Sequence, residues 1–116
     1  GLELGTHDVF TSVSGALKIN DPGCDLALAL AVASSLMNKT LPPTLLVLGE
    51  VGLGGEVRPV SQIENRLKEC ARMGFNQIIL PLSQVPKRVT KELKGVKFYG
   101  INTLEKCLDI AYDLAE

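Results

Sequence analysis

The sequence predicts an α/β domain in which a mixed sheet is packed with helices. Short aliphatic runs typical of strands alternate along the chain with Ala/Leu-rich or amphipathic stretches typical of helices. The 116 residues suffice for one compact domain, which we expect to cover residues 1–116. Hydrophobic residues make up 46% of the chain and aromatic residues only 4%, so the core must be aliphatic. The expected element order is β-α-β-β-α-β-α-β-α.

The N-terminal third predicts a strand followed by a buried helix. Apolar and polar residues alternate in part over Val9–Ile19, which indicates a strand. Asp21-Pro22-Gly23 is typical of a helix start, because Asp can cap and Pro suits the first helical position. The Ala/Leu-rich run Asp25–Met37 is apolar all round and predicts a buried helix.

The middle third predicts a buried strand, a hairpin and an amphipathic helix. Thr44–Leu48 is apolar on both faces, as in the centre of a sheet, and the glycines at 49–55 predict a tight hairpin returning over Glu56–Val60. Ser61-Gln62-Ile63-Glu64 matches a capping box, with Ser61 as the cap and Glu64 reaching back. Gly74 ends this helix. Its buried stripe is Ile63, Leu67, Cys70 and Ala71.

The C-terminal third predicts two further strands and two helices. Gln77–Leu80 and Val96–Tyr99 are short aliphatic or aromatic runs typical of strands. Pro86–Leu93 is predicted as a helix with Val85, Val89 and Leu93 facing inward. Asn102-Thr103-Leu104-Glu105 caps a final helix. That helix buries Leu104, Cys107, Leu108 and Ala111, among which the cysteine acts as a small hydrophobe.

Composition and charge exclude several classes of protein. The longest apolar stretch, Leu26–Ala33, is too short to span a bilayer. Three cysteines without metal-ligand spacing indicate a reduced, cytoplasmic protein, and a single histidine, His7, argues against a His-based zinc site. We therefore expect no metal and no other cofactor in this domain, and no membrane partner.

The charges are unevenly distributed. Residues 58–97 hold nine cations and three acids, although the net charge of the chain is −1. Such a basic face can neutralise phosphates of duplex DNA without reading bases, and the alternative is an ordinary solvated helix face. The candidate DNA-binding residues are Lys87, Arg88, Lys91 and Lys94, together with Arg66, Lys68 and Arg72 on the preceding helix.

The motifs of the hairpin and its flanks carry a family resemblance. Gly49–Val60, with the sequence GEVGLGGEVRPV, and the later Ile79-Leu80-Pro81 resemble the proteolytic domain of Lon. Asp25–Ala31, Arg58–Gln62 and Arg66–Glu69 resemble more closely the Lon-like C-terminal domain of the RadA (Sms) family of bacterial recombination and repair ATPases. The resemblance covers nearly the whole chain.

This resemblance implies a fold, a setting and partners. It implies a Lon-like fold, a C-terminal position in a longer protein, and a role in homologous recombination, branch migration and DNA repair. The zinc motif and the ATPase that uses ATP and Mg would lie upstream of this domain. The implied partners are duplex DNA, further copies of the chain in a hexameric ring, and recombinase-coated DNA.

The same resemblance raises the question of peptidase activity. A Lon-type site needs a serine nucleophile and a lysine base, and matched residue by residue these positions hold Cys24 and Glu64. A carboxylate beside the nucleophile raises the nucleophile's pKa, so we expect no catalytic residues and no peptidase activity in this domain. Pairs of Cys24 with Lys68 or His7 remain conceivable. The alternatives are an active Lon-type serine or cysteine peptidase, and a Lon-like domain of another ring ATPase.

Overall fold

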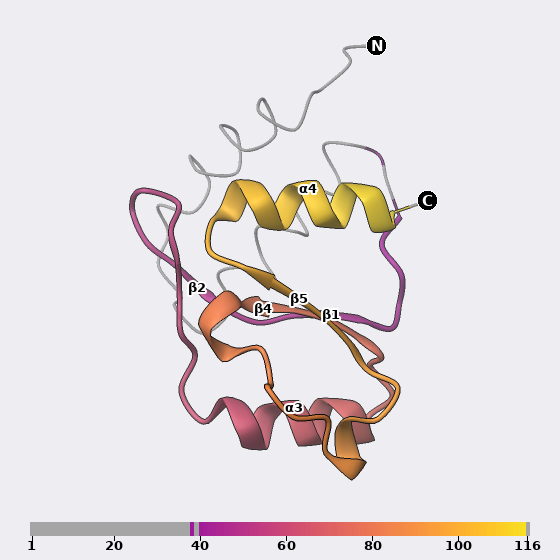
Figure 1. The fold of residues 1–116 in the computed structure, drawn as a ribbon. Helices are drawn as coiled ribbons and strands as arrows, with labels where there is room; N and C mark the ends of the chain where they lie inside the picture. Colours follow the sequence, from indigo (N-terminus) through magenta and orange to yellow (C-terminus); the bar gives the residue numbers. More distant parts are fainter. Residues whose placement is uncertain (1–37, 39, 116) are drawn as a thin grey trace.

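The computed structural model describes residue 38 and residues 40–115, which form a parallel sheet between two helices (Figure 1). The three strands of this sheet are β1 (Leu45–Val47), β4 (Gln77–Pro81) and β5 (Lys97–Ile101), in the order β1-β4-β5. Helix α3 (Ile63–Arg72) lies on one face and α4 (Leu104–Leu114) on the other. The predicted α/β class is confirmed.

Strand β4 is the middle strand of the β1-β4-β5 sheet and separates two apolar clusters. Leu46 of β1 pairs with Ile78, which in turn pairs with Phe98 of β5. Successive side chains of a strand point to opposite faces, so Ile79 packs toward α4 whereas Ile78 and Leu80 pack toward α3. All three β4 side chains are fully buried. The α4 cluster also holds Ile101, Leu104, Cys107, Leu108 and Ala111, and the α3 cluster holds Leu67 and Leu93.

The predicted hairpin is present and is tied to the start of α4. Its strands are β2 (Glu50–Val51) and β3 (Val57–Arg58), which pair antiparallel. The backbone N–H of Leu104 donates to the Gly55 carbonyl oxygen at 2.7 Å, and the N–H of Val57 donates to the Asn102 carbonyl oxygen at 2.9 Å. The hairpin therefore sits on the α4 side of the sheet, and its tip projects outward (Figure 1).

The two predicted helix caps have different outcomes. The predicted cap segment 102–105 does begin α4, and within it Thr103 is the cap, because its Oγ1 accepts the Lys106 backbone N–H at 3.1 Å. The capping box at α3 is wrong. The N-cap there is Gln62, in a left-handed conformation with φ 54° and ψ 40°, and no side chain caps the helix. The left-handed turn at Gln62 separates Ser61 from the first turn of α3.

The rest of the prediction for α3 is largely confirmed. Leu67 is buried, while Ile63, Cys70 and Ala71 are half-buried against the same cluster. Gly74 follows the helix with φ 100°, and its N–H donates to the Ala71 carbonyl oxygen at 3.1 Å. Glycine adopts this backbone conformation without steric cost, which explains why the helix ends there.

The predicted helix over Pro86–Leu93 is wrong. Two short 3-10 turns, η2 (Leu82–Gln84) and η3 (Lys91–Leu93), are joined by irregular chain. Val85 is extended, with φ −61° and ψ 126°, as proline at the next position favours. Leu93 is buried and Val85 half-buried, as predicted, but Val89 is 75% exposed and does not face inward.

The predicted strand Val9–Ile19 and helix Asp25–Met37 lie outside the described residues, as do His7 and Cys24. Over the part of the chain that the structure describes, no helix has the length and apolarity to cross a membrane.

Candidate nucleic-acid interface

The seven predicted DNA-binding cations lie on two segments that contact each other. Helix α3 packs against η3, and Lys68 lines one cavity with Lys87 and Arg88, whereas Arg66 lies on another flank of α3, beside Leu48 and Cys70. Lys68 is half-buried and the other six are exposed. We call this set the basic side: Arg66, Lys68, Arg72, Lys87, Arg88, Lys91 and Lys94.

The Glu92 carboxyl of η3 lies near two cations of α3. The pKa of this exposed carboxyl is lowered first by a hydrogen bond from its own backbone N–H and then by one from the Thr90 hydroxyl. The charges of Lys68 and Arg72 on α3 lower it further. The η3 carboxylate therefore lies within the field of the α3 cations. The sequence analysis did not single out Glu92, although its place among the lysines of 87–94 was visible.

Among the described residues, one cation of the basic side forms a salt bridge. Arg72 Nη1 lies 3.3 Å from Glu69 Oε2, in a pair whose side chains are both more than half exposed. Such an exposed pair contributes at most about 1 kcal/mol to stability. Within the described residues, none of the other six cations forms a salt bridge. Their charge is therefore available to an external anion.

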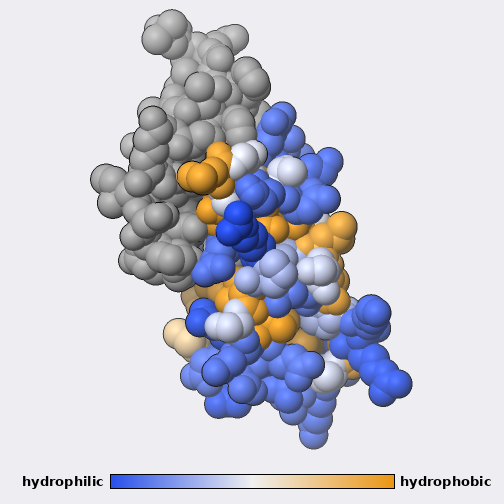
Figure 2. Space-filling view, turned by 90° about the vertical axis from the view of Figure 1, so that its left-hand side faces the viewer, coloured by the Kyte–Doolittle hydropathy of each residue, from blue (hydrophilic) through white to orange (hydrophobic). Residues whose placement is uncertain are grey.

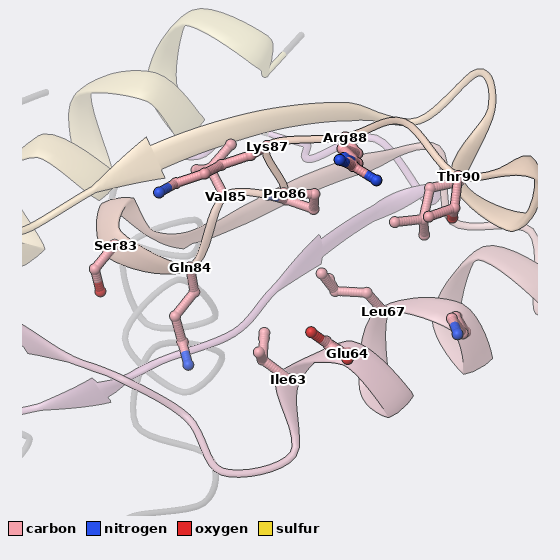
Figure 3. Close-up of a pocket in the computed structure, with 12 residues that line it drawn as sticks. Ile63, Glu64, Leu67, Ser83, Gln84, Val85, Pro86, Lys87, Arg88 and Thr90 are labelled. Atoms are coloured by element: carbon pink, nitrogen blue, oxygen red, sulfur yellow. The ribbon is translucent and has the colours of Figure 1, made fainter.

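A cavity of about 560 Å³ opens between α3 and residues 83–93 (Figure 3). Glu64 and Leu67 project from α3 toward the segment that carries Pro86, Lys87 and Arg88. Apolar side chains form much of its surface, and cations stand at its edge. The apolar residues are Ile63, Leu67, Val85, Pro86 and Leu93, the charged ones Glu64, Lys68, Lys87 and Arg88, and the uncharged polar ones Ser83, Gln84 and Thr90.

The sequence patterns did not indicate this cavity, because they predicted a continuous helix over residues 86–93. A helix would have presented Val85, Val89 and Leu93 as one inward stripe. Two 3-10 turns joined by irregular chain instead leave a hollow in front of α3. Pro86 after the β-branched Val85 was the one local signal against a helix beginning there.

The residues matched to a Lon-type dyad are only partly described. Cys24 lies outside the described residues, and Glu64 and Lys68 lie within them. Glu64 is exposed in the first turn of α3 and lines the cavity.

The two described cysteines are poor nucleophiles. Burial raises the pKa of Cys107 to about 12. Burial and the charge of Glu69 raise that of Cys70, against the opposing effect of Arg66. Because the thiolate is the reactive form, both raised pKa values disfavour reaction of these thiols at neutral pH.

Comparison with known proteins identifies the family. A family model described as subunit ChlI of Mg-chelatase matches residues 1–84, which is more than half of the chain. The chain belongs to the ChlI family. Relatives named DNA repair protein RadA match most of this chain and confirm the predicted resemblance to the RadA family.

Three of these relatives illustrate the match. The RadA of Chlamydia pneumoniae is 50% identical over 101 residues, which are 83% of this chain and 22% of the relative. That of Synechocystis sp. is 46% identical over 111 residues, covering 96% of this chain and 21% of the relative. That of Escherichia coli is 41% identical over 114 residues, covering 98% and 24%. The ChlI-family chain thus spans less than a quarter of the length of these relatives.

Proposed function

We propose that this chain is a non-proteolytic, Lon-like scaffold domain of a RadA-type DNA repair protein. In this role it supports ring assembly and binds duplex DNA during homologous recombination, branch migration and repair. The observation that supports the proposal is the closeness of cations from α3 and residues 82–94, because Lys68, Lys87 and Arg88 line one cavity and α3 packs against η3. The proposal assigns ATP hydrolysis with Mg, and zinc binding, to other parts of the longer protein.

The chemistry of the basic side suits duplex DNA. Exposed lysines and arginines neutralise phosphates and release counterions without reading the sequence, as a ring that moves along DNA requires. Aromatic residues make up 4% of the chain, so stacking surfaces for unpaired bases are scarce. We therefore expect duplexes to be preferred over single strands.

Glu64 supports the non-proteolytic part of the proposal. A carboxylate at the position matched to the lysine base is a much weaker base than a neutral amine and carries a negative charge. The charged neighbour disfavours the thiolate or alkoxide that the reaction needs. We expect no hydrolysis of an unfolded protein by the chain. Hydrolysis that Cys24→Ala abolishes would establish the alternative, an active peptidase.

Charge reversal tests DNA binding. Lys91→Glu with Lys94→Glu should weaken binding to all duplex sequences alike, and should reduce the slope of log K against log salt by about two units. Lys97→Glu with Lys106→Glu is the matched control, because it changes the net charge equally outside the basic side. Titration across a salt series with circular dichroism for folding is the measurement.

The quadruple variant extends this test to Lys87 and Arg88. Replacing Lys87, Arg88, Lys91 and Lys94 with Glu should flatten the salt dependence by several units. If the folded quadruple variant binds duplex DNA with unchanged affinity and salt slope, these four residues form an ordinary solvated surface. Equal losses of affinity and salt slope in the Lys97 and Lys106 control would show that the change in net charge, and not the basic side, weakens DNA binding.

A further inference from the structure

Leu53 is a large apolar side chain presented to solvent at the tip of the β2–β3 hairpin, with an exposed fraction of 107%. Backbone hydrogen bonds define the tip: Gly52 N–H donates to the Glu56 carbonyl oxygen at 2.8 Å, and Gly55 N–H donates to that of Gly52 at 3.0 Å. The Glu56 carboxylate also accepts the Gly54 N–H at 3.0 Å. Leu53 therefore stands on a structured projection. An exposed leucine alone is ordinary, so its meaning depends on a matching surface.

A matching apolar hollow lies elsewhere on the molecule. The cavity between α3 and residues 83–93 has an apolar lining of Ile63, Leu67, Val85, Pro86 and Leu93 and is open to solvent (Figure 3). Figure 2 looks onto the side of the molecule where the hairpin and the start of α3 lie in Figure 1, and there hydrophobic surface is flanked by hydrophilic side chains. The volume of about 560 Å³ can take a leucine with backbone on either side.

The tip cannot enter the cavity of its own chain. Gly54 and Gly55 lie beside Thr103, Glu105 and Asp109, at the start of α4. The cavity belongs to α3, on the opposite face of the sheet (Figure 1). The hydrogen bonds that join Gly55 to Leu104 and Val57 to Asn102 hold the hairpin on the α4 side. The occupant that these surfaces fit is thus a second copy of the chain.

The charges around the two surfaces are complementary. Acidic residues predominate near the tip, where Glu50, Glu56, Glu105 and Asp109 accompany Arg58 and Lys106. At the cavity, Lys68, Lys87 and Arg88 outnumber Glu64. When the tip of one copy approaches the cavity of another, opposite charges meet around an apolar centre. Such an arrangement favours encounter and fixes orientation.

We propose that the Leu53 tip of one copy inserts into the α3 cavity of the next, in a head-to-tail contact. This contact joins different surfaces of the two copies, so it can propagate and close into a ring. The inference rests on the proposed role in ring assembly and names the surfaces that meet there. Lys68, Lys87 and Arg88 lie at this contact in an assembled ring, where duplex DNA would rely on Arg66, Arg72, Lys91 and Lys94, whereas all seven cations are accessible to DNA in a single copy.

Complementation between two variants of the 116-residue chain tests the contact. Leu53→Asp removes the tip, and Ser83→Trp fills the cavity from an exposed position. Each variant alone should self-associate at least tenfold more weakly than the wild type in sedimentation velocity experiments. An equimolar mixture should form 1:1 dimers and nothing larger, because each pair retains one intact tip and one intact cavity.

Matched controls guard against trivial effects of the substitutions. Met73→Asp is the same kind of change at an exposed apolar side chain outside the cavity, and Asn76→Trp adds the same bulk at another exposed site. Both controls should associate like the wild type. Circular dichroism should show all four variants folded, since each position is exposed.

The outcomes separate this inference from the proposed function. Wild-type association in both Leu53→Asp and Ser83→Trp, or no dimers in their mixture, would overturn the tip-to-cavity contact and leave ring assembly standing on another surface. A wild-type chain that stays monomeric at millimolar concentration would overturn both the tip-to-cavity contact and the proposed role in ring assembly. DNA binding with a wild-type salt slope in Leu53→Asp is expected, whereas failure of the Lys91 and Lys94 reversal would remove only the DNA-binding proposal.

Discussion

Gln84 binds both backbone groups of Val60, a residue 24 positions earlier in the chain. Its Oε1 accepts the Val60 N–H at 2.9 Å, and its Nε2 donates to the Val60 carbonyl oxygen at 2.8 Å. This pair joins η2 to the segment that leads from the hairpin into α3. It thereby fixes one end of the cavity that α3 and residues 83–93 enclose.

Gln84→Ala should therefore destabilise the chain. Two part-buried hydrogen bonds are lost, and Val60 loses both partners, so the free energy of unfolding should fall by about 1–3 kcal/mol. Urea denaturation followed by circular dichroism measures it. Asn65→Ala, an exposed amide on α3, is the control and should stay within about 0.5 kcal/mol of the wild type. A loss in Gln84→Ala no larger than in the control would show that the pair contributes nothing.

The two cap sequences predict different losses for similar substitutions. Thr103→Ala removes the acceptor of the Lys106 N–H and should lower the free energy of unfolding by about 1 kcal/mol. Ser61→Ala should leave it within about 0.5 kcal/mol, because Ser61 is exposed and does not cap α3. Parallel urea titrations of both variants check this. Equal losses would mean that Ser61 caps α3 in solution.

Local sequence was sufficient for the elements whose signals agree with their surroundings. Strand β4 is a run of aliphatic residues, and Thr103 precedes an amphipathic helix whose buried stripe was predicted residue by residue. The glycines at 49–55 matched a real hairpin. In each case the pattern and the packing require the same conformation, so propensity and tertiary structure do not compete.

The incorrect predictions concern segments whose local sequence pattern is compatible with two conformations. Ser61 and Glu64 have capping-box spacing, but the chain turns through a left-handed Gln62 before α3 begins. Lys87, Lys91 and Lys94 have helical spacing, but Pro86 holds Val85 extended and the segment forms 3-10 turns. The cavity is a product of that irregular segment and of the Gln84 contact across 24 residues. Residue spacing and composition do not reveal a contact between residues 24 positions apart. The cations could therefore be predicted from the sequence, whereas the cavity that some of them line could not.

Gly100 in β5 is expected to resist substitution. A Cβ added there would lie 2.6 Å from Leu82 Cδ1 and 2.8 Å from Val85 Cγ2, with the Leu82 backbone also close. Gly100→Ala should therefore push η2 away from the sheet and cost about 1–2 kcal/mol, despite the lower chain entropy of alanine. Gly54→Ala is the control, since its Cβ would meet only the Glu56 carboxylate at 3.5 Å. Thermal unfolding of both variants compares them, and equal midpoints would contradict the close packing of η2 on β5.

Cys107 makes the stability of the fold sensitive to alkaline pH. The side chain is fully buried in the α4 cluster, and burial raises the pKa of its thiol from 9.0 to about 12. Above pH 9 the unfolded chain releases this proton while the folded chain retains it. The unfolded state then binds fewer protons, so the free energy of unfolding falls as pH rises, up to the folded pKa. The contribution is fully present below pH 9 and is lost between about pH 9 and 12.

Cys107→Ala should remove this part of the pH dependence. Between pH 9 and 11 the wild type should lose stability more steeply than the variant, by a difference approaching about 1.4 kcal/mol per pH unit. The variant should be less stable at pH 7 because its smaller side chain leaves a cavity, so the slopes and not the absolute values are compared. Urea denaturation at half-unit steps from pH 7 to 11 gives both curves. Cys70, half-buried in α3, titrates in both proteins and cancels. Parallel curves for wild type and variant would show that the Cys107 thiol ionises alike in the folded and unfolded states, contrary to its burial between α4 and the sheet.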